Sequence, residues 1–473
     1  MKILKKKISI LLISTIITIS YFIASPTVGK DQKVISGDLE IKRLLDENFR
    51  LEALLIKLNK LTSLQERKLS RQEKALIIIK TNGSIDLSLA ELDKKKRGDE
   101  IEIKKSKISL LKNLSLEKYL LTSGFYAGIN NRFPGSGYID FYEDNILVLS
   151  ARGVLAFKKN LDDDKENFTQ IKNNINKFIG LKQFHKKDKR NDKYWFSLKD
   201  IFIFNGKVFV SYTEEIKEDC WNTSIIYGDM NYENIKFKKL FSPKECVHSA
   251  RNIDNEFNAH QSGGKIISFD DNHILLSIGE YRSRYLAQDK KSVNGKIIKI
   301  NLSDKNYTII SMGHRNPQGL YFDKENNFIL ETEHGPNGGD EINLIAVDKI
   351  KKEIPNYGWP ISSAGKHYGS VGIKKYEKYP LYNSHSEYGF IEPLKSFVPS
   401  IGISAIVKIG KNKYVMGSMR SKSLYFFKLN KQREIINLDV VKVHERVRDL
   451  RFKDNKLYLF MEDTASIGVI SFN

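Results

Sequence analysis

From about Ile101 to the C-terminus, the hydrophobic residues occur in short runs separated by turn-forming residues. Most runs are rich in Val, Ile, Phe and Tyr and are bounded by Asn, Asp, Gly or Lys, which is typical of β-strands. Neighbouring runs are separated by dipeptides such as Asn205-Gly206 and Asp454-Asn455, which predict tight hairpins. The predicted strands are Asn145–Ser150, Asp200–Phe204, Lys207–Tyr212, His273–Ile278, Lys296–Ile300, Asn327–Thr332, Lys413–Gly417, Ser423–Leu429, Lys456–Phe460 and Ile467–Phe472.

This pattern predicts an all-β domain over residues 101–473. Strands do not alternate with helical segments, so a parallel sheet covered by helices is excluded. About 370 residues of short antiparallel strands exceed one sandwich and suit a β-propeller. With 473 residues, of which 41% are hydrophobic, the chain can build the sizeable core that such a fold needs.

The chain is strongly basic, with a formal net charge of +21 at pH 7. Such a charge can attract nucleic acid or an anionic membrane. However, the lysines are spread along the whole chain, with small clusters at Lys94–Arg97 and Lys186–Arg190, and no nucleic-acid-binding motif accompanies them. We therefore expect no nucleic-acid partner and attribute the charge to a solvated basic surface, with a functional anionic partner as the alternative.

The chain has two cysteines, Cys220 and Cys246. Two thiols cannot form a structural zinc site, and they do not form a Cys-x-x-Cys motif. In an exported protein they could form one disulfide that closes a long loop, and two separate buried thiols are the alternative.

Residues 1–28 are predicted to be a signal peptide or a membrane anchor. Four lysines within residues 1–7 precede the uncharged apolar run Ile8–Ala24, which is the order of an export signal. The run is intermediate in length between a signal peptide and a spanning helix, and Ser25-Pro26 interrupts the expected cleavage site, so both alternatives stay open. We expect a periplasmic or extracellular protein, tethered to the inner membrane through residues 8–24 if the segment is retained.

Residues 29–100 are predicted to form a helical, coiled-coil-like stalk followed by a linker. Leu44, Leu51 and Leu58 repeat every seven residues, and Leu54 and Leu61 complete an a/d pattern. A coiled coil over residues 37–76 would join copies of the chain into a homo-oligomer or hold the main domain away from a membrane. The alternative is a single amphipathic helix packed on that domain.

The stretch Gly313–Pro360 concentrates polar residues at turns of fixed geometry. Arg315, Asn316, Glu333 and His334 lie among glycines and prolines, whose backbone geometry other residues resist. Polar side chains at such turns are what a preformed site for a small ligand or a metal needs. Two polar turns that flank one strand are the alternative.

This stretch, with its segments GHRNPQGL, EHGPNGGDE and NYGWP, resembles the signature of the soluble quinoprotein glucose/sorbosone dehydrogenases, also called aldose sugar dehydrogenases. Four further segments, HQSGGKI, VPSIGIS, GSMRSK and RVRD, extend the resemblance from about Asp200 to the C-terminus. The resemblance implies a six-bladed β-propeller. It also implies oxidation of an aldose by pyrroloquinoline quinone (PQQ), with electrons passing to a quinone or cytochrome acceptor.

The same resemblance implies roles for two catalytic residues. His260, in HQSGGKI, would be the general base that takes the hydroxyl proton at the anomeric carbon, a task for which the near-neutral pKa of an imidazole is suited. Arg315 would lie near the quinone carbonyls, where it would stabilise the charge that develops during reaction.

The resemblance further implies a set of cofactor-binding residues. PQQ carries three carboxylates, and the fork of an arginine binds a carboxylate through two hydrogen bonds. Arg446 and Arg448 match the family's Arg-x-Arg-Asp segment and, at a spacing of two, share one strand face. Asn316 would lie near the quinone carbonyls, and Ser400 and Arg420 take the places of a cofactor-contacting hydroxyl residue and lysine.

Family members also hold a calcium ion that polarises the quinone. The backbone carbonyls of Gly335 and Pro336 take the place of its ligands, and hard oxygen donors of this kind suit calcium. Asp340 and Glu341 would either coordinate an ion or brace the loop.

Two departures from the family pattern favour a second hypothesis. Ala259 precedes His260 where sugar-oxidising relatives commonly carry an aspartate that orients the base, and the expected upstream glutamine is not recognisable around Asn191–Ser197. The alternative function is a catalytically degenerate propeller that binds a glycan or a protein.

Overall fold

The computed structural model describes residues 100–101, 103–110, 114–121, 136–159, 161, 167–184, 196–350, 353–368 and 377–472. The predicted signal or anchor at 1–28 and the predicted stalk and linker, except for Glu100, lie outside these residues. Most of the segment around Asn191–Ser197 lies outside them as well. Within the described part of the chain, the model contains no helix that is both long and apolar enough to cross a membrane.

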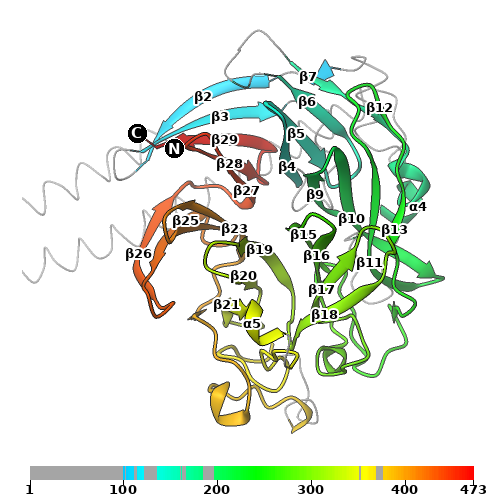
Figure 1. Ribbon diagram of the computed structural model, residues 1–473, viewed down its shortest axis with the longest axis vertical. Helices are drawn as coiled ribbons and strands as arrows, with labels where there is room; N and C mark the ends of the chain where they lie inside the picture. The colour runs from blue at the N-terminus through cyan, green and yellow to red at the C-terminus, as the bar shows by residue number, and fades with distance from the viewer. Residues whose placement is uncertain are drawn as a thin grey trace, which may run out of the picture. The chain divides into compact units, whose positions relative to one another are not determined.

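Six antiparallel sheets of four or five strands surround a common centre and form a six-bladed β-propeller (Figure 1). We number the blades 1 to 6 in the chain order of their innermost strands. Each innermost strand contacts the innermost strands of both neighbouring blades, so the ring is closed. The innermost strands of blades 1 to 6 are β4 (Gly137–Tyr142), β9 (Leu198–Phe204), β15 (Gly263–Asp270), β19 (Pro317–Asp323), β23 (Ile403–Gly410) and β27 (Val447–Lys453).

The other strands follow outward from the centre in each blade. Blade 1 continues with β5 (Asn145–Ser150), β6 (Leu155–Lys158), β7 (Phe168–Gln170) and β1 (Glu100–Ile101). Blade 2 continues with β10 (Lys207–Lys217), β11 (Cys220–Asp229) and β13 (Lys238–Phe241), and β14 (Val247–His248) also pairs with β11. Blade 3 continues with β16 (His273–Ile278), β17 (Lys296–Asn301) and β18 (Tyr307–Met312).

Blade 4 continues with β20 (Phe328–Glu333), β21 (Asp340–Ala346) and β22 (Lys395–Phe397), and blade 5 with β24 (Lys413–Ser418), β25 (Ser423–Leu429) and β26 (Ile435–Lys442). Blade 6 continues with β28 (Lys456–Met461), β29 (Ser466–Ser471), β3 (Ser115–Leu121) and β2 (Ile103–Ser109). A short parallel pair, β8 (Lys172–Asn173) and β12 (Asn234–Ile235), and two one-turn helices, α4 (Leu181–Phe184) and α5 (Val347–Ile350), lie outside the blades. Single 3₁₀ turns occupy Ile175–Lys177, Arg284–Ala287 and Ser386–Tyr388.

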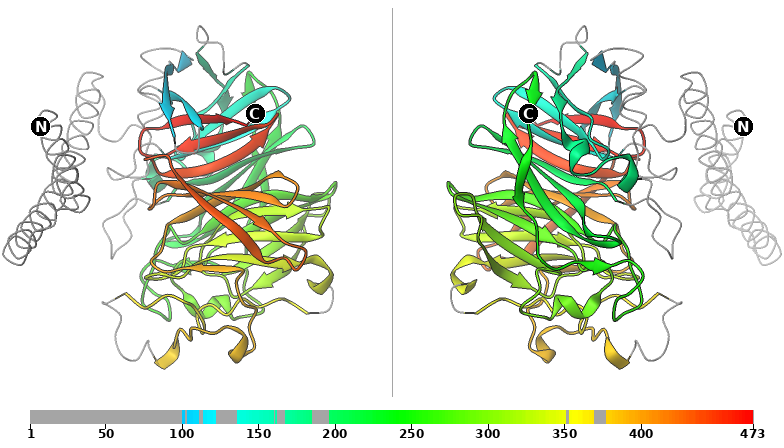
Figure 2. Two further views of the ribbon diagram at one scale, coloured as in Figure 1. Left: turned by 90° about the vertical axis from the view of Figure 1, so that its left-hand side faces the viewer. Right: turned by 90° about the vertical axis from the view of Figure 1, so that its right-hand side faces the viewer.

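Blade 6 joins the two ends of the described chain. Strand β3 pairs antiparallel with the C-terminal strand β29, with Tyr119 opposite Ile467. Figure 2 shows the blue and cyan strands β2 and β3 beside the red C-terminal strands. The ring is therefore closed by hydrogen bonds between segments more than 300 residues apart in sequence, as the partners Glu117 and Val469 illustrate.

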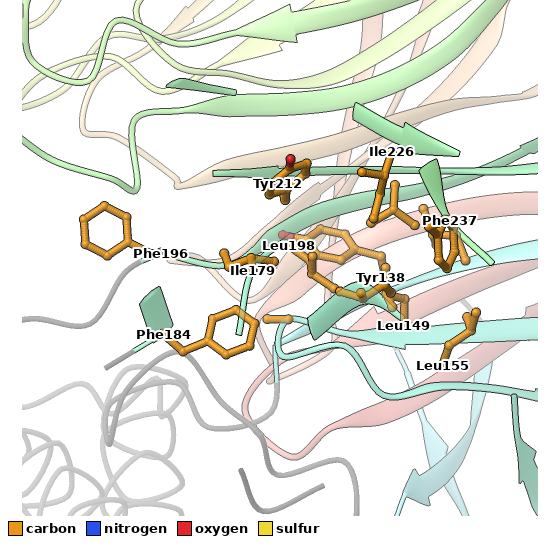
Figure 3. Packing of buried hydrophobic residues seen from close by; sticks show 14 of the residues in the cluster. Tyr138, Leu149, Leu155, Ile179, Phe184, Phe196, Leu198, Tyr212, Ile226 and Phe237 are labelled. Atoms are coloured by element: carbon orange, nitrogen blue, oxygen red, sulfur yellow. The ribbon is translucent and has the colours of Figure 1, made fainter. Parts of the chain in front are cut away.

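Each of the six interfaces between neighbouring blades holds its own cluster of buried hydrophobic side chains. Successive side chains of a strand point to opposite faces of its sheet, so every blade can contribute to the clusters on both sides. Between blades 1 and 2, fully buried Trp221 stacks on Phe196 with ring centroids 3.6 Å apart. Figure 3 shows this cluster, with Tyr138, Leu149 and Leu155 from blade 1 and Leu198, Tyr212 and Ile226 from blade 2.

Near the axis, buried carboxylates on innermost strands bind the next strand of the ring. Asp200 of β9 accepts the backbone N–H of Ile266 in β15 at 2.9 Å, and Asp449 of β27 accepts that of Ile139 in β4 at 3.1 Å. Lys265 Nζ lies 2.9 Å from Asp200 Oδ1 and 2.8 Å from Asp449 Oδ1. These pairs are almost fully buried, so they fix the blades to one another at the centre.

The fold predicted from the sequence is confirmed: the domain is all-β and has six blades. All ten predicted strands are present, although several extend beyond the predicted ends, as β10 does from Tyr212 to Lys217. The predicted hairpin turn at Asn205-Gly206 has φ of 48° and 67°, the left-handed conformation that such dipeptides favour. Cys220 and Cys246 form a disulfide, so the alternative of two free thiols was wrong.

Candidate functional site

The predicted site residues all lie beside strand ends at one face of the propeller. Within each blade the innermost strand and its neighbour run antiparallel, so the start of the first and the end of the second share that face. Residues at the starts of innermost strands, or in the loops before them, are His260, Arg315, Asn316, Ser400, Arg446 and Arg448. Residues just after the second strands are Gly335, Pro336 and Arg420.

His260 is half-buried and surrounded by positive groups. Burial lowers the pKa of His260 well below its usual value, and neighbouring cationic groups lower it further. Its backbone N–H donates to Asn258 Oδ1 at 2.9 Å, which fixes the loop before β15. The imidazole is therefore neutral near pH 7 and able to accept a proton. The groups that act on it are Lys199, Arg448, Arg446 and His334.

Arg446 and Arg448 share one carboxylate. Glu462, which follows β28 and is fully buried, accepts Arg446 Nε at 3.2 Å and Arg448 Nε on its other oxygen. Burial opposes ionisation, but the two guanidinium groups outweigh it and lower the pKa of Glu462 to about 2. Glu462 therefore holds both guanidinium groups side by side at this position.

Arg315 and Asn316 connect the loops of blades 3 and 4. Arg315 Nη1 donates to the backbone oxygen of His334 at 2.9 Å, and its guanidinium lies 5.3 Å from the ring centre of Trp359. Asn316 Oδ1 accepts the backbone N–H of Gly263 at 3.1 Å, which ties it to the segment that carries His260. Both side chains are almost fully buried, so these loops hold the two residues in fixed positions.

The Gly335-Pro336 turn is braced by Asp340. One carboxylate oxygen of Asp340 accepts the backbone N–H of Gly335 at 3.1 Å, and the other accepts that of Gly402 at 2.6 Å. A Cβ on Gly335 would lie 2.0 Å from the backbone oxygen of Gly339, so no larger residue fits there. The sequence left open whether Asp340 coordinates an ion or braces the loop, and these hydrogen bonds show that it braces the loop. A small pocket beside this turn is lined by Arg315, Glu333, His334, Gly335, Gly339, Glu341, Trp359, Ser362 and Ser363.

Ser400 and Arg420 come together at the start of blade 5. The Ser400 hydroxyl is buried and has no hydrogen-bond partner among the described residues. Arg420 is exposed, and its backbone N–H donates to the backbone oxygen of Ile401 at 2.9 Å. A buried hydroxyl without a partner is costly and indicates a place where a ligand atom can bind.

A second group of potential metal ligands lies beneath the site in blade 4. Ligand atoms of His314, Glu331 and Glu333 lie within 4.8 Å of one another and are buried. Asn343 Nδ2 donates to both carboxylates, at 3.0 and 3.1 Å. Burial, and then the charge of Glu333, raises the pKa of Glu331 well above its usual value. Glu333 also accepts the backbone N–H of Arg315, so this cluster braces the loop that carries that arginine.

Sequence reasoning missed two residues of this site, Lys199 and Glu462, and gave no specific role to a third, Gln318. Lys199 lies at the start of β9 and Glu462 after β28, and neither belongs to a recognisable motif. Gln318 lies within GHRNPQGL, where its position signalled a role, and its side chain joins Asn316 to Arg448 at 3.0 and 3.3 Å. Lys199 acquires its role only through packing between blades, whereas Glu462 meets its two arginines within blade 6, where β27 pairs with β28.

Comparison with known proteins places the chain among sugar dehydrogenases. The family model described as glucose/sorbosone dehydrogenase matches residues 196–469. An uncharacterised protein of Synechocystis is 28% identical over 219 residues, which cover 40% of this chain and half of that protein. The aldose sugar dehydrogenase of Escherichia coli is 23% identical over 289 residues, 56% of this chain and 72% of the relative.

Solved structures agree in fold. A glucose dehydrogenase crystal structure aligns with a TM-score of 0.56 at 21% identity, covering 71% of this chain and 96% of that one. The PQQ-bound aldose sugar dehydrogenase of Streptomyces coelicolor aligns with a TM-score of 0.51 at 18% identity, covering 71% and 93%. The family model covers more than half of the 473 residues and includes every predicted site residue. This chain belongs to the glucose/sorbosone dehydrogenase family.

Proposed function

We propose that the chain is an exported, PQQ-dependent aldose dehydrogenase. One observation carries the proposal: a neutral imidazole, His260, lies near Arg446 and Arg448 at the face where the predicted site residues meet. A base with no positive charge of its own can take a proton, and the surrounding cations can hold an anionic cofactor.

The side chains present fit PQQ in charge and in hydrogen-bonding capacity. Arg446, Arg448 and the exposed Arg420 would bind its carboxylates, and the partnerless hydroxyl of Ser400 would donate to one of its oxygens. The backbone carbonyls of Gly335 and Pro336 would hold a calcium ion, because the brace from Asp340 fixes that turn.

The reaction would convert the anomeric C1–OH of an aldose into a lactone carbonyl. When bound, the quinone supplies the hydride acceptor, which no side chain can provide. A ring nitrogen of His260 would accept the hydroxyl proton, so that the electrons of the C–H bond can leave carbon. The Arg315 guanidinium, held by the backbone oxygen of His334, would stabilise negative charge that develops opposite the base.

Reconstitution tests this function. The purified full chain is mixed with calcium and PQQ, and the absorption spectrum of the quinone is recorded while aldoses are added. We expect a bound quinone that a sugar bleaches. A quinone that binds but that no aldose reduces would exclude aldoses as substrates. Absence of quinone binding would reject the proposed function.

A glycan- or protein-binding propeller remains the second candidate because of Ala259. This residue is buried and stands directly before His260. Ala259 cannot supply the carboxylate that, at this position, commonly orients such a histidine and raises its basicity. A failed reconstitution together with binding to a glycan array would support this candidate.

Export is supported by the disulfide between Cys220 and Cys246, because disulfides persist in oxidising compartments. We place the protein in the periplasm or outside the cell, with the segment at residues 8–24 as its tether or cleaved signal. Its electrons would then pass to a quinone or a cytochrome acceptor in that compartment.

A further inference from the structure

We propose that Lys199 is a positioning residue for His260: bound to the Ala259 carbonyl, its ammonium fixes the adjoining peptide and keeps the imidazole unprotonated. The role of His260 as a base rests on the proposed function. The contact of Lys199 with Ala259 and its effect on the protonation of His260 do not rest on it, because both are properties of the chain alone.

The position of Lys199 is unusual for a lysine. It is the second residue of β9 and is only 9% exposed. Its Nζ donates to the backbone oxygen of Ala259 at 3.2 Å, directly before His260. Among the described residues, no carboxylate forms an ion pair with it and no second hydrogen-bond acceptor serves it. A buried lysine is normally paired, so this one is held at a cost in stability.

The neighbouring strand is shaped around the Lys199 side chain. Strand β15 contains a β-bulge between Gly263 and Ile266, and Gly264 within it has a φ of +116°. A Cβ on Gly264 would lie 2.3 Å from Lys199 Cβ. Ser211 Oγ donates to the backbone oxygen of Gly264 and fixes the bulge. Gly264 thus leaves room for a side chain at position 199, beside the strand that follows His260.

Charge explains what Lys199 does there. A positive charge beside an imidazole disfavours the imidazolium form, so Lys199 adds to the effect of burial on His260. Burial lowers the pKa of Lys199 to about 7. The charges of Arg448 and Arg152 also lower this pKa, whereas the charge of Glu462 raises it. Below about pH 7 the lysine is charged and repels a proton from His260. At higher pH Lys199 loses its charge, but the imidazole of His260 is already neutral at such pH values.

Lys296 is a buried lysine with a purely structural environment and serves as the matched control. Its Nζ donates to three backbone oxygens, those of Leu286, Ala287 and Asn294, at 2.7, 3.0 and 2.8 Å. Every N–H of that ammonium is used, whereas Lys199 uses one. Lys296 is not among the groups that lower the pKa of His260 most strongly.

The test is a histidine titration by NMR on the full chain, without quinone or sugar. The nine histidines are labelled with ¹³C in the ring, and the signal of His260 is identified by its loss in His260→Gln. We expect Lys199→Met and Lys199→Gln to move the His260 midpoint to higher pH. Glutamine keeps a donor for the Ala259 carbonyl, so it separates the charge from the hydrogen bond. Lys199→Arg and Lys296→Met should leave the midpoint unchanged.

Three results would overturn the inference. The midpoint could stay unchanged in both neutral variants, Lys199→Arg could shift it as Lys199→Met does, or Lys296→Met could shift it equally. In the reconstituted enzyme, Lys199→Met should also move the acid limb of the kcat/KM profile to higher pH. If the midpoint moves as expected but PQQ never binds, the inference about Lys199 stands and the proposed function fails.

Discussion

His260 is surrounded by positive charge, and this limits how it can act as a base. Burial and the adjacent cations keep its pKa low, so it is neutral over a wide pH range but has little driving force to hold a proton. We expect His260→Gln to lower turnover of the reconstituted enzyme by about 10²–10⁴-fold, the usual contribution of a general base. Quinone binding, measured by absorbance, should persist, because Arg446 and Arg448 are unchanged. Unaltered turnover would exclude His260 as the base.

The buried carboxyl group of Glu280 should make the stability of the folded protein depend on pH. It is fully buried, and burial raises its pKa to about 7, although nearby arginines act in the opposite direction. In the unfolded chain, the carboxyl group of Glu280 has its ordinary pKa of 4.5. Its contribution to stability is therefore fully present below about pH 4.5 and is lost as the pH rises through about 7.

The variant Glu280→Gln isolates this contribution. The free energy of unfolding of the wild type relative to the variant should fall by about 3 kcal/mol between pH 4.5 and 7.5. Urea unfolding at both pH values measures it. A difference that is constant with pH would mean that folding does not change the pKa of Glu280.

Innermost strands are held together by buried ion pairs as well as by apolar clusters. Asp200 binds Lys265 at 2.9 Å and the N–H of Ile266 at 2.9 Å, with almost no exposure to solvent. We expect Asp200→Asn to destabilise the domain by about 3 kcal/mol or more, because it removes one partner of a buried charge. The control is Asp229→Asn, whose partner Lys207 lies at the surface, and its effect should stay below about 1 kcal/mol. Equal effects on urea unfolding would contradict the role of Asp200.

At the scale of strands, the sequence predicted most where local chemistry decides the structure. Strands bounded by Asn, Asp or Gly were placed within a few residues, because hairpin turns demand those residues. Strands β2 and β26 were missed: both are largely exposed outer strands, and the three lysines of β2 leave it no apolar run. Strand β19 was missed for a different reason: Pro317 and Gly319 disguise a strand whose partners are set by blade 4.

Over the whole molecule, the site depends on closure of the ring. Resemblance to a family predicted the residues of the candidate site, but not the sharing of Glu462 by two arginines or the approach of Lys199 to His260. The contacts between blades join distant segments: Lys199 and Ala259 are 60 residues apart, and Gln318 and Arg448 are 130 apart. Glu462 lies only 16 and 14 residues from its arginines, but their meeting depends on the pairing of β27 with β28. A propeller brings the same end of every innermost strand to one face, so six separate loops build a single site.

The disulfide connects the fold to the compartment in which it forms. Cys220 and Cys246 are 26 residues apart, and closing a loop of that size stabilises a protein by about 3 kcal/mol through the unfolded chain. The full chain expressed with its N-terminal segment should therefore contain no free thiol when denatured and titrated. The same chain without residues 1–28, kept in a reducing cytoplasm, should contain two and unfold at lower urea. The double variant Cys220→Ser with Cys246→Ser is the control, and it should be equally stable from either compartment. Two free thiols in the full chain would contradict export, because an oxidising compartment would have joined them.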